Sequence, residues 1–127
     1  MIQPQRILIA SDEAFPAPIR AALEHRGFEV TIAQDFKSGY SQLLQSAFDL
    51  AIVDLAEGTD GVDFIKRIRA TTQLSKTVIL ATAEWGTGQA TLALSQGADA
   101  FEPKPLDAPS LVAAVERLLV KQKAVAQ

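Results

Sequence analysis

The chain has 127 residues with 48% hydrophobic and 21% charged residues, a composition typical of one globular domain with its own core. It contains no cysteine, which excludes disulfides, thiolate metal sites and a thiol nucleophile. A formal net charge of -3 and a pI of about 5.1 argue against a basic surface for nucleic acid.

The N-terminal segment does not indicate export or membrane attachment. Residues 1–6 have no charged stretch followed by a long apolar core, so we expect a cytoplasmic protein without a signal peptide or membrane anchor. Lys66, Arg67 and Arg69 are close in sequence, but their spacing distributes them around one helix and favours a solvated face. We therefore expect no direct binding of nucleic acid and no membrane contact.

Short apolar runs alternate with segments of helical periodicity five times along the chain. The strand-like runs cover residues 6–10, 28–32, 50–54, 77–82 and 98–102. Apolar residues at helical spacing predict helices that begin near Pro16, Phe36, Val62, Gly88 and Ser110. This order predicts an α/β fold with a parallel sheet and helices on both faces. We expect a single domain over residues 1–127, with its core over about 6–120 and a polar tail at 121–127.

Polar side chains stand where these predicted strands end. Asp54 ends the apolar run 50–53, Asp12 follows the first strand, Thr82 ends the fourth, and Lys104 follows the fifth. The carboxyl ends of parallel strands share one edge of a sheet, where ligands bind in open α/β folds, so we expect these groups to converge. Taken alone, Asp54 is equally well explained as a turn cap.

This set of groups suits phosphoryl transfer to a carboxylate. An aspartate such as Asp54 can attack phosphorus and form an acyl phosphate. Asp12, Glu13 and Asp54 would repel one another, and Mg²⁺ would relieve that repulsion. Lys104 can pair with phosphoryl oxygens, and Thr82 can donate a hydrogen bond to one of them.

In this combination the chain resembles the receiver domain of two-component response regulators, from Arg6 to about Val120. The matching motifs are Asp12-Glu13, Asp54, Thr82-Ala83 and Lys104-Pro105, after the first, third, fourth and fifth strands. The resemblance implies a flavodoxin-like fold with strand order 2-1-3-4-5. It also implies that Asp54 accepts a phosphoryl group from a histidine kinase or phosphotransfer protein. Such a domain catalyses its own phosphorylation and dephosphorylation and is not a metabolic enzyme.

The resemblance further implies a set of metal ligands. Mg²⁺ would be held by Asp12, Asp54 and the backbone carbonyl of Ala56, with Glu13 supporting the acidic cluster. Lys104 would contact the phosphoryl group, and the peptide bond between Lys104 and Pro105 would be cis.

The resemblance also implies a conformational switch. Thr82 would move toward the phosphoryl group, and Phe101 would turn into the space that it leaves. The face formed by the fourth helix, fifth strand and fifth helix would then change, offering a surface to an output protein or domain, or to a homodimer. Trp85 lies in the loop expected to move, which makes it a candidate partner contact and a fluorescent probe.

Two features depart from the family pattern. Ser11 stands where the family usually has an acid, so we expect it to reach a metal at most through water and to weaken Mg²⁺ binding. The loop after Asp54 is a residue shorter than usual, with Gly58 where a proline is common nearby.

Two alternatives remain open at this point. The first is a receiver-like protein-interaction module that is not phosphorylated. The second is a small flavodoxin-like enzyme or cofactor carrier, which the sequence disfavours because the loop after the first strand lacks a cradle rich in Gly, Ser or Thr for a phosphate ester.

Overall fold

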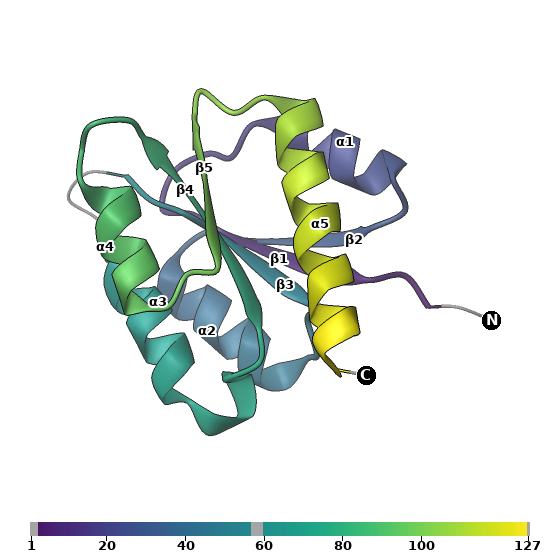
Figure 1. The fold of residues 1–127 in the computed structure, drawn as a ribbon, viewed down its shortest axis with the longest axis horizontal. Coiled ribbons are helices and arrows are strands. Elements are labelled where there is room, and N and C mark those ends of the chain that lie inside the picture. The colour runs from purple at the N-terminus through teal and green to yellow at the C-terminus, as the bar shows by residue number, and fades with distance from the viewer. Residues whose placement is uncertain (1–2, 57–59, 127) are drawn as a thin grey trace.

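A computed structural model describes residues 3–56 and 60–126 of the chain. Its centre is a five-stranded sheet in the order β2-β1-β3-β4-β5, in which all neighbouring strands run parallel (Figure 1). The strands are β1 (Arg6–Ala10), β2 (Glu29–Ala33), β3 (Leu50–Asp54), β4 (Val78–Glu84) and β5 (Ala100–Lys104). This order confirms the predicted flavodoxin-like fold.

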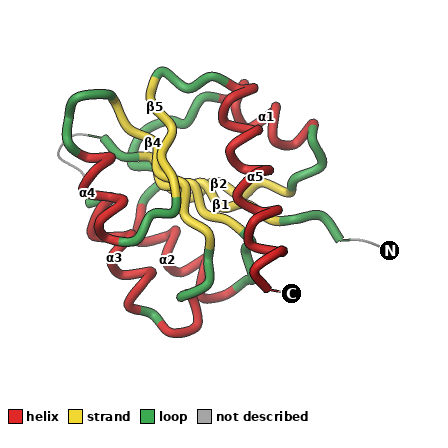
Figure 2. The backbone as a smooth tube through the Cα atoms, viewed as in Figure 1, coloured by secondary structure: helices red, strands yellow, loops and turns green. Residues whose placement is uncertain are grey.

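Helices cover both faces of the sheet. They are α1 (Ala17–His25), α2 (Phe36–Gln45), α3 (Gly61–Ala70), α4 (Gln89–Gln96) and α5 (Ala108–Ala126), with a short 3-10 helix η1 (Thr72–Leu74) that was not predicted. Helices α1 and α5 lie on one face, and α2, α3 and α4 lie on the other (Figures 1 and 2). None of the helices within the described ranges has the length and apolar character needed to cross a bilayer.

The sheet separates two hydrophobic cores. Along β1, Ile7 and Ile9 pack toward α1 and α5, whereas Leu8 and Ala10 pack toward α2 and α3. Such alternation explains why β1 reads as a continuous apolar run, since a strand buried on both faces needs apolar residues at every position. The site-bearing strand β3 is likewise buried along its whole length.

Local signals set the helix ends. Pro16 precedes α1 and Pro18 lies in its first turn, where a missing N–H costs nothing. At the start of α2 the Asp35 carboxylate accepts a hydrogen bond of 2.7 Å from the Ser38 backbone N–H, and this bond lowers the pKa of Asp35. Helix α4 ends at Gly97, whose φ of 125° suits glycine.

The fifth strand lies further along the chain than predicted. Residues 98–102 were expected, but the Ala98 backbone N–H instead bonds to the Ala93 carbonyl at the end of α4, so β5 begins at Ala100. The strand therefore includes Pro103, which is tolerated because β5 is at the sheet edge. Lys104 is its last residue, and the peptide bond that follows is cis, as expected.

Candidate functional site

The strand register brings three polar residues together at the carboxyl edge of the sheet. In the pairing of β1 with β3, Ala10 lies opposite Val53, which places the next residue, Ser11, beside Asp54. In the pairing of β3 with β4, Asp54 lies directly opposite Thr82. Asp54 is only 5% exposed, so the sheet presents a nearly buried carboxylate at the edge where ligands bind in this class of fold.

Both carboxylate oxygens of Asp54 have protein partners. Oδ1 accepts a hydrogen bond of 2.7 Å from the Thr82 hydroxyl and lies 2.8 Å from the Lys104 ammonium. Oδ2 accepts a hydrogen bond of 2.7 Å from the Ser11 hydroxyl. The Lys104 ammonium also donates to the Leu55 carbonyl at 2.9 Å, which holds it over the end of β3. We refer to Ser11, Asp54, Thr82 and Lys104 as the Asp54 cluster.

The Asp54 cluster balances the charge of a buried acid. Burying a carboxylate is costly unless it is paired and hydrogen-bonded, and here the ammonium of Lys104 and two hydroxyls meet that need. Throughout the described part of the chain, no buried side-chain nitrogen or oxygen lacks a hydrogen-bond partner. The site is therefore a closed polar network with one negative and one positive group.

Asp12 and Glu13 do not join this network as side chains. Both are exposed, and among residues 3–56 and 60–126 no three His, Cys, Asp or Glu side chains form a group that could hold a metal ion. Glu13 contributes through its backbone N–H, which donates to the Ser11 hydroxyl at 3.1 Å. Ala56 is partly buried just after β3, and the predicted short loop at residues 57–59 lies outside the described residues.

Ser11 is the site residue whose role the sequence did not predict. From the sequence we predicted only how it reaches a metal; in the structure it is 1% exposed and its hydroxyl donates directly to Asp54. The signal that could have revealed this contact is the register of β1 with β3, which apolar periodicity alone does not define.

Two aromatic residues, one in β5 and one just after β4, contact each other. Phe101 is the second residue of β5. It is partly buried and packs against the core beneath α3 and α4. The Trp85 ring meets the Phe101 ring edge to face, with centroids 5.4 Å apart and an interplanar angle of 88°. Trp85 is nevertheless 73% exposed, so it covers Phe101 while presenting most of its own surface to solvent.

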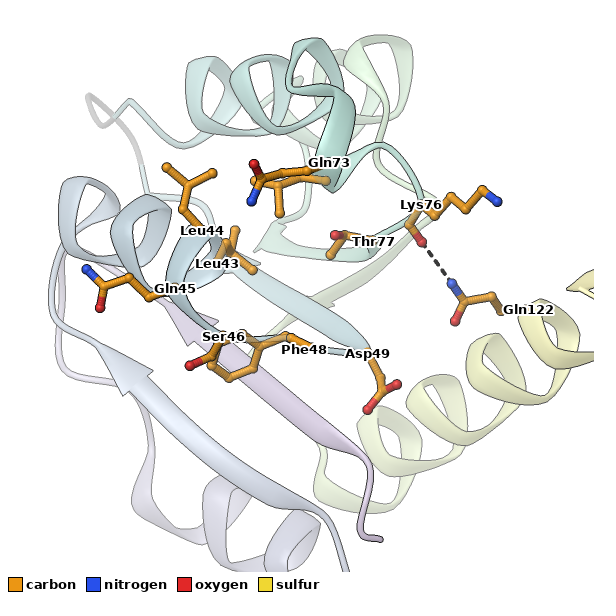
Figure 3. A pocket seen from close by; sticks show the side chains of 12 residues that line it. Leu43, Leu44, Gln45, Ser46, Phe48, Asp49, Gln73, Lys76, Thr77 and Gln122 are labelled. Carbon is orange, nitrogen blue, oxygen red and sulfur yellow. Dashed lines mark hydrogen bonds between the residues drawn. The ribbon is translucent and has the colours of Figure 1, made fainter.

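A pocket at the other ends of the strands is separate from the Asp54 cluster. Figure 3 shows this pocket, of about 450 Å³, between the end of α2, the starts of β3 and β4, and Gln122 of α5. Gln122 donates to the Lys76 carbonyl at 2.8 Å across it. None of the Asp54 cluster residues lines the pocket, because they stand at the other ends of the same strands.

A parallel sheet of this order, with a buried aspartate bonded to a lysine and a hydroxyl at its carboxyl edge, defines the class of protein. The family model described as the response regulator receiver domain matches residues 7–116. The chain belongs to this family.

The comparisons also identify individual relatives. The chain is 32% identical over 119 residues to the response regulator ArlR of Staphylococcus saprophyticus, covering 92% of this chain and 53% of ArlR. It is 32% identical over 114 residues to the transcriptional regulatory protein CpxR of Escherichia coli, covering 89% of this chain and 48% of CpxR. The chain thus spans about half the length of these curated relatives.

A solved structure supports the fold. The response regulator receiver domain protein from Methanospirillum hungatei superposes with a TM-score of 0.84, covering 95% of this chain and 98% of that chain. At 23% sequence identity this likeness bears on the fold alone.

Proposed function

We propose that Asp54 accepts a phosphoryl group from the phosphohistidine of a histidine kinase or a phosphotransfer protein. An Asp54 carboxylate oxygen attacks phosphorus, the phosphorus–nitrogen bond breaks, and the histidine nitrogen leaves with the bonding electrons. The observation behind this proposal is the nearly buried Asp54 carboxylate with the Lys104 ammonium 2.8 Å away and the Thr82 hydroxyl at 2.7 Å.

Lys104 and Thr82 are positioned to stabilise the transferred group. Both contact the same oxygen of Asp54, so a phosphoryl group arriving there meets an ammonium and a hydroxyl donor at once. Fixed donors of this kind stabilise the charge on the phosphoryl oxygens without having to reorganise during transfer. The Leu55 carbonyl holds the ammonium in place before the reaction.

The oxygen donors that follow β1 and β3 are of the kind that Mg²⁺ prefers. We propose that Asp54, Asp12 and the backbone carbonyl of Ala56 hold the ion, with Glu13 supporting. Mg²⁺ needs only a few carboxylates and keeps several waters. The buried Asp54 and the exposed Asp12 and Glu13 are a set of this size. When bound, Mg²⁺ would neutralise charge that develops during phosphoryl transfer.

Phosphorylation would change the α4, β5 and α5 face. The group adds about −1.5 to −2 charge and three acceptor oxygens, which favours movement of the Thr82 hydroxyl from Asp54 to the phosphoryl group. Phe101 would follow toward the space near Thr82. Because Trp85 contacts the Phe101 ring, its environment would change at the same time.

The output belongs to another protein or domain. We propose that residues 1–127 act as one receiver unit whose α4, β5 and α5 face binds an output domain, an output protein or a second copy of the chain. The relatives support an output beyond this unit, because the chain covers about half of each.

Phosphorylation can be tested with a small phosphodonor such as acetyl phosphate and Mg²⁺, followed by intact-mass measurement. We expect wild type to gain the mass of one phosphoryl group and Asp54→Asn to gain none. Asp63→Asn is the matched control, because Asp63 is exposed in the first turn of α3. Equal labelling of wild type and Asp54→Asn would refute the assignment.

One observation favours a second candidate function, a protein-interaction module that is not phosphorylated. Ser11 fills the position of a family acid and bonds to Asp54, so the resting network is already satisfied. Such a module would bind its partner equally well with and without phosphodonor and Mg²⁺. Partner affinity that rises on phosphorylation of Asp54 would exclude it.

A further inference from the structure

The orientation of the Ser11 hydroxyl is determined by its two partners. Its oxygen lies 2.7 Å from Oδ2 of Asp54 and 3.1 Å from the backbone nitrogen of Glu13. The backbone N–H can only donate and an ionised carboxylate can only accept, so the single hydroxyl proton points at Asp54. Ser11 is 1% exposed, which leaves it little room to turn away without a local rearrangement.

This hydroxyl occupies the oxygen of Asp54 that Lys104 and Thr82 leave to other partners. Those two residues contact Oδ1, so Oδ2 is the oxygen that faces the Ser11 side of the site. A divalent cation coordinated by Asp54 on that side needs an oxygen lone pair and repels a proton directed at the same atom. A cation coordinated through Oδ2 draws electron density from that oxygen, so it weakens the hydrogen bond from the Ser11 hydroxyl.

The charge around Asp54 makes this competition matter. Lys104 already offsets the charge of Asp54, and Ser11 adds no negative charge to attract a cation. Exposed Asp12 and Glu13 do not combine with Asp54 into a group of three acids within the described residues. Weakening of the Ser11 hydrogen bond is thus a direct cost of cation binding.

We infer that the Ser11 hydroxyl competes with a divalent cation for Oδ2 of Asp54 and so limits the affinity of the site for Mg²⁺. Ser11 is in this sense a positioning residue, which holds Asp54 in a metal-free network with Lys104 and Thr82. The inference rests on the part of the proposed function in which Asp54 binds Mg²⁺. The sequence predicted weaker Mg²⁺ binding from the missing acid alone, and the inference adds a hydrogen bond that cation binding must weaken.

The contribution of the Ser11 hydroxyl is tested with Ser11→Ala. We expect the alanine variant to bind Mg²⁺ about tenfold more tightly than wild type in calorimetric titration, because cation binding no longer weakens a hydrogen bond to a charged group. Ser11→Asp should bind more tightly still, since it adds a carboxylate. Ser95→Ala is the matched control: the Ser95 hydroxyl bonds to the Leu92 carbonyl within α4.

The result that overturns the inference is a Ser11→Ala variant, folded as judged by its melting curve, that binds Mg²⁺ equally, more weakly or not at all. Intact-mass measurement on wild type separates this failure from failure of the proposed function. A phosphorylated wild type with no gain for Ser11→Ala rejects competition at Oδ2 and leaves the acceptor role of Asp54. Tighter Mg²⁺ binding by Ser11→Ala without any phosphoryl adduct on wild type rejects the acceptor role and leaves the competition.

Discussion

Replacing Lys104 by methionine tests whether the Asp54 cluster acts as one charge-balanced unit. The Lys104 ammonium lies 2.8 Å from Oδ1 of Asp54, and the two side chains are 20% and 6% exposed. At an effective dielectric constant of about 20, the attraction at this separation is about 6 kcal/mol before desolvation is subtracted. Removing one partner of a buried pair costs about 3–5 kcal/mol, and the partial exposure of Lys104 places Lys104→Met near 3 kcal/mol.

The coupling between the two charges is measured with a double-mutant cycle. In an Asp54→Asn background the ammonium faces a neutral amide, so Lys104→Met should cost only about 1 kcal/mol. The interaction energy is then about 2 kcal/mol, obtained from urea unfolding of the four proteins in EDTA. Lys66→Met, on the exposed side of α3, should change the free energy of unfolding by less than about 0.5 kcal/mol. Single effects that add to within about 0.5 kcal/mol would refute the paired arrangement.

Three further predictions concern the stability of the fold. Gly97→Ala should lower the free energy of unfolding by about 1–3 kcal/mol, because φ is 125° there and a Cβ would collide with the Arg69 side chain; an unchanged urea midpoint would contradict this. Asp35→Ala should lower the melting temperature at neutral pH. The hydrogen bond from the Ser38 N–H lowers the pKa of Asp35. The Asp35 carboxylate therefore stabilises the fold above about pH 4, and this stabilisation is lost as pH falls through the folded-state pKa. A difference in melting temperature between wild type and Asp35→Ala that persists in stronger acid would count against the cap. Glu102→Gln should raise the melting temperature at neutral pH, because burial raises the pKa of Glu102. Protonated Glu102 is tolerated by the fold below the ordinary glutamate pKa range, and the fold loses stability as pH rises through the raised folded-state pKa and the carboxylate becomes charged. The higher melting temperature of the glutamine variant should therefore vanish below about pH 4.

The sequence predicted both the fold and the convergence of Asp54, Thr82 and Lys104 for one physical reason. Parallel strands that are buried on both faces read as uninterrupted apolar runs, and their carboxyl ends must share an edge. Asp54, Thr82 and Lys104 each stand at the end of such a run, so their convergence follows without any knowledge of side-chain geometry. The structure brings these three together within hydrogen-bonding distance.

The contacts of the residues after β1 could not be predicted in the same way. Ser11, Asp12 and Glu13 are consecutive, and apolar periodicity does not say which of them turns toward Asp54 once the strand has ended. The register of β1 with β3 decides the matter in favour of Ser11, while the two acids remain exposed. Register depends on packing across the whole sheet, so it is weakly encoded in any short segment.

Helix α4 shows a second limit of pattern reading. Leu92, Ala93 and Leu94 indicate a helix, but three consecutive residues point in three directions around it. In the structure Ala93 is buried, whereas Leu92 and Leu94 are 49% and 46% exposed. The contact of Trp85 with Phe101 was also not predicted, because it depends on the path of the loop between β4 and α4.

The central claim is that the phosphoryl group resides on Asp54, and the most direct measurement is to locate it. Ser11 and Thr82 each place a hydroxyl 2.7 Å from the Asp54 carboxylate, so intact mass alone does not distinguish the three. After labelling with acetyl phosphate, fragmentation mass spectrometry should find the adduct on Asp54, and hydroxylamine should remove it, as expected for an acyl phosphate. A hydroxylamine-stable adduct on Ser11 or Thr82 would contradict the account.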